Sequence, residues 1–340
     1  MSLTVGPLRG GGFVPWWRCG SRCRHCLYGC GPHRRDGSVE GAPAREKVLD
    51  RLAERGGKAR WHLGGGEPFL QPDALAAWIG GMVSRGLPLE YVETNASWVQ
   101  DRAHAEQVLG DLAERGLACL LVSLSPFHAE YVPFARTRAL IEAAQRVLPA
   151  GAFVWIPDFV PDVAGAPSER PLDLGALLAE KGDDYALELA ARYGLVAGGR
   201  AGRFRAAHGD RRRWEDVAAE APCRSRLADT SHFHVDAAGN YLPGLCAGIA
   251  LRWEEVPGTV DLGRYPVLRA LLGPDGLAGL VAAACDHGFV PLAAGYSDPC
   301  DLCTHVRLHL FIRDAGTHPE LGPAGFYEPA SLPGYATTPA

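Results

Sequence analysis

Short apolar runs alternate with longer amphipathic segments over the first 160 residues of the chain. In the amphipathic segments apolar side chains recur every three to four residues, which predicts helices over residues 44–56, 73–86, 104–116 and 135–148. Three of these segments end at a glycine that can adopt the left-handed capping conformation. The apolar runs predict strands at residues 61–65, 89–95, 117–125 and 152–157. Strands and helices in this alternation predict βαβ units and a parallel sheet.

The pattern changes after about residue 160. Residues 160–171 are expected to form a loop or linker, and residues 174–194 a helix. Residues 232–244 predict a hairpin, because two short strand patterns flank an Ala-Gly-Asn turn. Residues 267–284 are helix-like with a Gly-Pro break, and residues 322–340, rich in Pro, Gly, Ala and Thr, are expected to be loosely ordered.

Length, charge and cysteine content narrow the classes of function. A chain of 340 residues suggests two domains, and a net charge of −5 argues against binding nucleic acid through a broad basic face. No apolar run is long enough to span a membrane, and the N-terminus lacks a secretory pattern, so a cytoplasmic protein without membrane association is expected. Ten cysteines in such a protein are expected to be metal ligands or catalytic groups rather than disulfides.

The first group of cysteines has the spacing CxxxCxxC, formed by Cys19, Cys23 and Cys26. Three thiolates on a tight loop can each bind one iron of a [4Fe–4S] cube, and the fourth iron then stays open to a chelating ligand. The alternative is a zinc knuckle. Structural zinc sites prefer CxxC pairs and a full set of four ligands, so this spacing favours iron.

Polar and glycine residues end three successive predicted strands. Because the carboxyl ends of parallel strands share one edge, these residues are expected to lie together there. Each one alone could equally be a helix N-cap or a turn residue. The set comprises Gly64, Gly65, Gly66 and Glu67, then Thr94 and Asn95, then Ser123.

Together with CxxxCxxC, these strand ends resemble the radical SAM superfamily over residues 12–160. The resemblance implies an α/β fold, a partial (β/α)6 barrel. It also implies that Cys19, Cys23 and Cys26 bind a [4Fe–4S] cluster whose open iron chelates S-adenosylmethionine.

The other site residues are carried over from the same resemblance. Gly65, Gly66 and Glu67 match the family's GGE segment, and Glu67 is expected to orient the amine of S-adenosylmethionine. His25 occupies the position expected near the adenine, and Thr94, Asn95 and Ser123 match residues that contact the carboxylate or ribose. Cys30 departs from the pattern and is expected to be a small buried or loop thiol.

The chemistry implied by the resemblance is reductive cleavage of S-adenosylmethionine. The resulting 5′-deoxyadenosyl radical abstracts hydrogen from a substrate, and a flavodoxin or ferredoxin is the expected electron donor. His128, which follows the third strand end in Ser-Pro-Phe-His, is a candidate catalytic group on the substrate side. The alternative is a solvent-facing histidine at a helix start.

A second group of cysteines lies in the last third of the chain. Cys223 and Cys246 flank the predicted hairpin, and Cys300 and Cys303 form a CxxC that opens a predicted helix. Four thiolates complete a site, and the arrangement resembles the twitch domain, a shortened SPASM domain that holds one auxiliary [4Fe–4S] cluster. Structural zinc is the alternative. Cys285 is a candidate replacement ligand or hydrogen donor, and Cys119 is expected to be a core residue.

These expectations divide the chain into a radical SAM core (1–165), linker helices that complete the barrel (166–222), a small α+β auxiliary-cluster domain (223–321) and a tail (322–340). Only 18 residues precede the first cysteine, too few for a peptide-binding domain. This favours a small-molecule substrate, such as a sugar or cyclitol that is oxidised or epimerised. The alternatives are a peptide-modifying enzyme with a separate recognition partner, and a non-catalytic iron–sulfur or zinc regulator.

Overall fold

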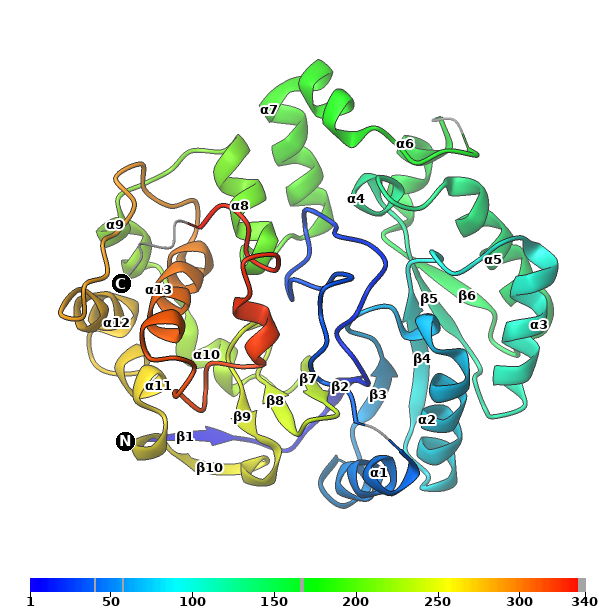
Figure 1. Cartoon of the computed structure of the whole chain (residues 1–340), viewed down its shortest axis with the longest axis horizontal. Helices are drawn as coiled ribbons and strands as arrows, with labels where there is room; N and C mark the ends of the chain where they lie inside the picture. Colours follow the sequence, from blue (N-terminus) through cyan, green and yellow to red (C-terminus); the bar gives the residue numbers. More distant parts are fainter. Residues whose placement is uncertain (40, 57, 166–167, 336–340) are drawn as a thin grey trace.

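A single eight-stranded sheet organises the molecule in the computed structural model, which describes residues 1–39, 41–56, 58–165 and 168–335. The strand order is β6-β5-β4-β3-β2-β7-β8-β9, and the strands from β6 to β7 in this order are parallel (Figure 1). The bounds are β2 Gly10–Val14, β3 Arg60–Leu63, β4 Leu89–Thr94, β5 Leu120–Ser123, β6 Ala152–Trp155, β7 Phe233–Asp236, β8 Asn240–Leu242 and β9 Leu251–Arg252. A separate antiparallel pair consists of β1 (Ser2–Val5) and β10 (Gly258–Asp261).

Helices connect the successive parallel strands, as the alternation in the sequence predicts. The mixed α/β class with a parallel sheet is therefore confirmed. The four predicted helices correspond to α1 (Ala42–Gly56), α2 (Pro72–Ser84), α3 (Arg102–Ala113) and α5 (Phe134–Val147), with the short α4 (Pro126–Ala129) before α5. The predicted strands correspond to β3, β4, β5 and β6.

The central strand β2 was not predicted, because its sequence is a glycine run. Glycine weakens an isolated strand, but here the neighbouring strands require it. A Cβ atom on Gly11 would lie 2.4 Å from the Phe233 ring, and one on Gly12 would lie 2.5 Å from His62 Nε2. Packing against β3 and β7 therefore selects glycine at positions that local strand propensity disfavours.

The predicted hairpin at residues 232–244 exists as β7 and β8, but it extends the main sheet. Strand β7 pairs in parallel with β2, so the sixth parallel strand lies beside the first and comes from the segment assigned to the auxiliary domain. One apolar cluster includes residues from both parts, such as Leu63 and Leu302. The domain boundaries themselves stay a prediction.

The remaining helices follow β6 in the chain. Residues 160–171 were expected to be loop, yet they contain α6, and the helix expected at 174–194 is interrupted at Gly182, whose φ is +79°. The two helices expected on either side of the Gly-Pro break are α11 and α12. The bounds are α6 Val160–Ala164, α7 Leu174–Tyr193, α8 Gly199–His208, α9 Trp214–Ala219, α10 Cys223–Ala228, α11 Pro266–Leu271, α12 Gly276–Cys285 and α13 Pro299–Arg313. Short 3-10 turns are η1 Pro68–Leu70, η2 Pro157–Phe159, η3 Trp253–Glu255, η4 Leu262–Arg264 and η5 Ala324–Tyr327.

The C-terminal segment is folded over residues 322–335, so the expectation of loose order was wrong there; residues 336–340 lie outside the described part. The Pro- and Gly-rich composition concealed four side chains that are buried: Phe326, Tyr327, Leu332 and Tyr335. Ser331 also hydrogen bonds to His33 through Oγ and Nε2 (2.8 Å), which ties this segment to the first cysteine loop. Within the described residues, no helix combines the length and apolarity needed to cross a bilayer.

Candidate active site

The loop between β2 and α1 carries the CxxxCxxC cysteines across the carboxyl edge of the sheet, in the centre of the molecule (Figure 1). Backbone bonds attach this loop to the end of β3. The amide of Glu67 donates to Arg18 O (2.9 Å), and the amide of Gly66 donates to Trp16 O (3.2 Å). These hydrogen bonds place the first cysteine group and the glycine segment side by side.

A cavity of about 390 Å³ lies between the cysteine loop and the strand ends. The structure brings most of the residues predicted for the first site to its wall, though not Gly64 or Glu67. Those lining it are Cys19, Cys23, His25, Cys26, Gly65, Gly66, Thr94, Asn95, Ser123 and His128. The residue pattern at three strand ends thus predicted one shared pocket, as the geometry of a parallel sheet requires.

Asn95, at the end of β4, connects the rim of the sheet to the first cysteine. Its Nδ2 group donates to Cys19 Sγ (3.4 Å), and the amide of Ser21 donates to the same sulfur (3.4 Å). These two donors favour the thiolate, which is the form that binds metal, whereas burial and the nearby Glu67 outweigh them and raise the pKa of Cys19 to about 12.

The three glycines at the end of β3 are each required by a close approach. Gly65 has φ +100°, a conformation that side chains rarely adopt. A Cβ atom on Gly66 would lie 2.1 Å from Arg18 O, and one on Gly64 would lie 2.6 Å from Glu93 Oε2. Gly65 and Gly66 therefore bring bare backbone to the cavity wall.

The expected contact of the Glu67 side chain with a ligand amine is not supported by the structure. Glu67 is fully buried and is not part of the cavity lining. Its Oε1 accepts hydrogen bonds from the Phe69 amide (3.2 Å) and Thr94 Oγ1 (2.9 Å), and Oε2 accepts from the Asn95 amide (2.8 Å). Burial raises the pKa of this carboxyl to about 7. Glu67 thus joins the ends of β3 and β4, and the adjacent glycines face the cavity instead.

Arg200, in α8, is a functional candidate that the sequence did not reveal. It is buried, and its guanidinium donates to Cys23 O (2.9 Å) and Cys30 O (2.6 Å). Its Nη1 atom has no hydrogen-bond partner among the described residues, and Arg200 lines the cavity. A buried guanidinium without a carboxylate partner requires nearby negative charge, which thiolates or an anionic ligand would supply.

Cys30 is more than the small buried thiol expected from the sequence. It is buried in the cavity wall, with its sulfur 3.3 Å from Gly65 O. Its hydrogen bond to Cys26 lowers the pKa of Cys26 to about 5. Cys30 therefore stabilises a predicted ligand as its thiolate.

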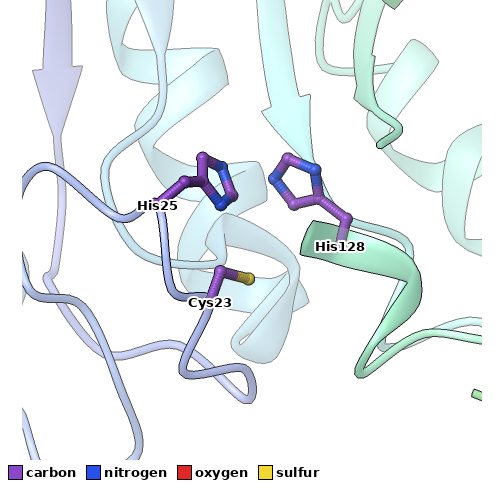
Figure 2. A group of neighbouring side chains, drawn as sticks. All are labelled: Cys23, His25 and His128. Carbon is purple, nitrogen blue, oxygen red and sulfur yellow. The ribbon is translucent and has the colours of Figure 1, made fainter. Parts of the chain in front are cut away.

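His25 and His128 point toward one another next to Cys23 (Figure 2). The ligand atoms of these three side chains lie within 4.8 Å of one another. His25 stacks on Phe127 with ring centroids 4.8 Å apart, and its Nε2 meets Tyr193 OH at 3.0 Å. His128 is buried with its Nδ1 2.9 Å from Ser125 Oγ, and burial lowers its pKa to about 4. The solvent-facing alternative for His128 is therefore wrong, whereas a catalytic role stays a prediction.

The second group of cysteines lies at three chain segments. Cys223 begins α10, Cys246 follows β8 in a turn, and Cys300 and Cys303 occupy the first turn of α13. Asp298 caps this helix by accepting a hydrogen bond from the Cys300 amide (2.8 Å). As the sequence indicates, Cys223 and Cys246 flank the hairpin, and Cys300 and Cys303 lie at the start of a helix.

Two arginines contact sulfur atoms of this second group. Arg307 is buried, and its Nε donates to Cys303 Sγ (3.3 Å), while Arg226 Nη1 donates to Cys300 Sγ (3.1 Å). Among the described residues, Arg307 forms no ion pair with a carboxylate; its other partners are neutral oxygens, including Ala247 O (3.0 Å). The positive charge of Arg307 is therefore compensated only if these sulfurs are anionic.

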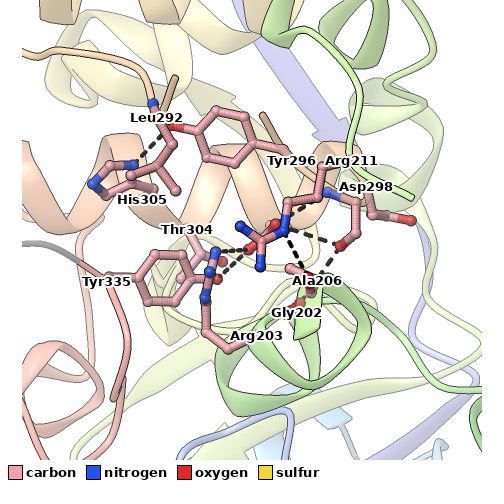
Figure 3. Close-up of polar contacts among 12 residues, drawn as sticks. Gly202, Arg203, Ala206, Arg211, Leu292, Tyr296, Asp298, Thr304, His305 and Tyr335 are labelled. Atoms are coloured by element: carbon pink, nitrogen blue, oxygen red, sulfur yellow. Dashed lines mark hydrogen bonds and ion pairs between the residues drawn. The ribbon is translucent and has the colours of Figure 1, made fainter. Parts of the chain in front are cut away.

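A polar network fixes the first turn of α13 against α8 and the C-terminal segment (Figure 3). Asp301, between the two cysteines of the CxxC, is fully buried. Its Oδ1 accepts from Tyr335 OH (2.8 Å) and from Arg203 Nη1 (3.4 Å). The orientation of Cys300 and Cys303 thus depends on residues from three distant parts of the chain.

The spacing of the sulfur atoms bears on the choice between zinc and a cube. Two thiolates on one zinc ion lie at most about 4.6 Å apart, because a Zn–S bond is about 2.3 Å long. In the part of the chain that the structure describes, no three cysteine sulfurs lie within 4.8 Å of one another. In the described residues neither group presents three sulfur atoms close enough to converge on one zinc ion without movement.

Two other cysteines lie outside these groups. Cys285, at the end of α12, is exposed and does not line the cavity, so its position does not support a role as hydrogen donor there. Cys119 is half-buried just before β5, where its thiol lies 3.8 Å from Ala150 O. It is therefore at the border of the core rather than fully inside it.

Three histidines were not singled out from the sequence: His62 on β3, His234 on β7, and His232 immediately before β7. Their ligand atoms lie within 4.8 Å of one another, and burial lowers the pKa of His62 to about 3. The alternation His-Phe-His in the predicted hairpin, with both imidazoles on one strand face, was the available signal.

Comparison with known proteins finds no matching family model and no matching curated protein. Solved structures with similar arrangements include native anSMEcpe with bound AdoMet (13% identity, 69% of this chain and 74% of that chain, TM-score 0.40) and BtrN in complex with AdoMet and 2-DOIA (14%, 71% and 75%, 0.34). A third is coproporphyrinogen III oxidase (HemN) from Escherichia coli, a radical SAM enzyme (14%, 47% and 41%, 0.33). An anSMEcpe complex with AdoMet and Cp18Cys peptide overlaps over only 42% of its own chain. At these TM-scores the overlaps alone carry no argument about function.

Proposed function

We propose that the protein is a radical SAM enzyme in which Cys19, Cys23 and Cys26 bind a [4Fe–4S] cluster. The observation that carries this proposal is the juxtaposition of the CxxxCxxC loop and three strand ends around one cavity. The unpartnered Nη1 atom of the buried Arg200 supports it, since an anionic cluster or ligand carboxylate would compensate that charge.

When bound, the cluster and S-adenosylmethionine supply reductive cleavage of a carbon–sulfur bond and hydrogen abstraction from a substrate. The protein holds the reactants and excludes water. Asn95 and Ser21 stabilise the Cys19 thiolate, and Arg200 fixes the carbonyls of the cysteine loop. Gly65 and Gly66 offer backbone groups to the amine of S-adenosylmethionine, while His25, Thr94 and Ser123 bound the space for the rest of it.

Anaerobic reconstitution tests this proposal. The wild-type protein is expected to bind iron and to form 5′-deoxyadenosine with S-adenosylmethionine and dithionite, and the variant with alanine at residues 19, 23 and 26 is expected to lose the activity. Cys119→Ala is the matched control, because that cysteine lies outside the cavity lining. Equal product from the triple variant would contradict the role of these cysteines. Iron bound by the wild-type protein without any 5′-deoxyadenosine would instead favour a non-catalytic regulator.

The second group of cysteines is proposed to bind an auxiliary [4Fe–4S] cluster in a twitch-like module. The buried Arg307 at 3.3 Å from Cys303 Sγ supports an anionic group at this place. About eight irons per chain with wild-type protein, and about four after alanine replacement at residues 223, 246, 300 and 303, are expected by iron analysis. Zinc bound by these cysteines would contradict the proposal.

A small-molecule substrate, such as a sugar or cyclitol that is oxidised or epimerised, is the proposed class. A cavity of about 390 Å³ agrees with the usual size of small-molecule sites. A flavodoxin- or ferredoxin-type protein is the proposed electron donor. Deuterated amino-cyclitols and hexosamines are expected to transfer deuterium to 5′-deoxyadenosine. Transfer from peptides alone would instead assign the protein to peptide modification.

A further inference from the structure

Three imidazoles lie close together on one face of the sheet. One of them, His62, is two residues before Gly64 on β3. His62 on β3 and His234 on β7 are both paired in register with Gly12 of β2, so they flank it on the inner face. His232 lies two residues earlier on the same face as His234 and is more exposed than the other two. These residues come from strands that lie 170 positions apart in the sequence.

Two of the imidazoles pack directly against the backbone of Gly12, one from each neighbouring strand. A Cβ atom at this position would lie 2.5 Å from His62 Nε2 and 2.8 Å from His234 Nε2. Any side chain at this position would displace the imidazoles, so glycine is what allows the two Nε2 atoms to lie close to one another.

The hydrogen bonding of the imidazoles leaves the Nε2 atoms of His62 and His234 available as ligand atoms. Tyr28 OH lies 2.8 Å from His234 Nδ1, which orients the ring and leaves Nε2 as the ligand atom. His62 stacks on Tyr91, and its buried Nε2 has no hydrogen-bond partner among the described residues. The nearest carboxylate oxygen is Glu93 Oε1, 3.6 Å from this atom.

We propose that His62, His232 and His234 bind one divalent transition-metal ion at this inner face of the sheet. Imidazole nitrogens suit zinc and iron(II), and three protein ligands leave a position for a fourth oxygen ligand. Glu93, or a molecule bound in the cavity that His232 and His234 line, can supply that oxygen. On a tetrahedral zinc ion the nitrogens would lie about 3.4 Å apart, so side chains now within 4.8 Å would approach by up to roughly 1.4 Å. Rotation of the imidazoles permits this movement.

None of the three proposed ligands is a cysteine, so zinc binding is measured without S-adenosylmethionine cleavage, although His232 and His234 line the same cavity as the first cysteine group. Anaerobically reconstituted protein is equilibrated with Zn²⁺ and dialysed, and X-ray absorption at the zinc edge reports only zinc. About one zinc per chain with nitrogen and oxygen neighbours and imidazole scattering is expected. Zinc absent after dialysis, or zinc bound by sulfur, overturns the proposal.

Variants assign the ligands. The double variant His62→Gln/His234→Gln is expected to lose zinc affinity by roughly tenfold or more, with iron content retained. The matched control is His287→Gln/His309→Gln, which removes two histidines outside the cavity lining. If the first double variant also loses iron, His232→Gln decides, because its side chain is the most exposed of the three and its replacement disturbs packing least. Unchanged zinc affinity in His232→Gln then overturns the proposal.

Discussion

Each candidate cofactor site is supported by buried residues with ionisable side chains: Glu67 and Arg200 at the first site and Arg307 at the second. Glu67, Arg200 and Arg307 are almost completely buried, and the hydrogen bonds of each go to backbone, hydroxyl or sulfur atoms rather than to an oppositely charged side chain among the described residues. Removal of one partner from a buried polar group costs more than the bond itself contributes, because the other group is left without solvation. The predictions at this scale use that asymmetry.

Glu67→Gln tests the structural role of this carboxyl. The amide nitrogen of glutamine would face one of the three donors that the carboxylate now accepts from. The free energy of unfolding is expected to fall by about 1–3 kcal/mol, measured by thermal or urea unfolding. The exposed Glu90→Gln is the control. Unchanged stability together with weaker binding of S-adenosylmethionine would instead favour the direct amine contact.

Arg200→Lys tests the two hydrogen bonds by which Arg200 holds the cysteine loop. Lysine cannot reproduce the two-pronged contact with Cys23 O and Cys30 O, so at least one buried carbonyl loses its donor. A loss of about 1–3 kcal/mol for each unpaired carbonyl and less iron retained at the first cysteine group are expected. Arg213→Lys, at an exposed ion pair, is the control. Equal iron retention in both variants would show that these hydrogen bonds are not needed to retain iron at the first cysteine group.

At the scale of elements, helix α13 combines a cysteine pair with a buried cation one turn later. Cys303 and Arg307 are four residues apart, so they lie on one helix face. The helix start is fixed by the cap at Asp298 and by the contacts of Asp301. The electrostatic environment of the second cysteine group is therefore built into one element.

Arg307→Met tests whether this cation acts on a redox group. A positive charge beside a cluster favours the reduced form, so its removal is expected to lower the reduction potential of the auxiliary cluster. A charge-assisted hydrogen bond of about 1.5–3 kcal/mol sets an upper limit of about 130 mV for one electron. Potentiometric titration followed by electron paramagnetic resonance measures the shift. An unchanged potential with intact iron would contradict this role.

At the scale of the whole molecule, the C-terminal segment connects the two cysteine regions. Ser331 contacts His33 of the first loop, and the Gly325 amide donates to Asp36 Oδ2 (3.2 Å). Tyr335 reaches Asp301 of α13. One segment thus contacts both candidate cofactor sites.

A chain that ends at residue 321 tests this connection. It loses the buried side chains of Phe326, Tyr327, Leu332 and Tyr335, each contributing about 1.5–3 kcal/mol on burial. The loss is comparable with the whole stability of an ordinary domain, so a much lower melting temperature and reduced iron at both sites are expected. A chain ending at Tyr335 keeps these contacts and is the control. Tyr335→Phe, which removes only the hydrogen bond to Asp301, is expected to affect the second site alone; equal iron content in all chains would refute the connection.

Local patterns in the sequence predicted much of this protein. Helix periodicity, glycine caps and strand runs gave α1, α2, α3 and α5 and the parallel strands between them. The CxxxCxxC spacing and the polar strand ends identified part of the cavity wall, and the CxxC at a helix start identified half of the second cysteine group. These features depend on neighbours within a few residues, so the sequence alone determined them.

Contacts between distant residues decided the rest. Strand β2 exists because Gly11 and Gly12 fit against Phe233 and His62, although a glycine run has low strand propensity. The direction of the Glu67 carboxyl follows from donors on the next strand. The burial of Arg200 and the meeting of His62 with His234 depend on chain segments that only folding brings together. Such pairings have no local period, and for this reason only the tertiary structure could establish them.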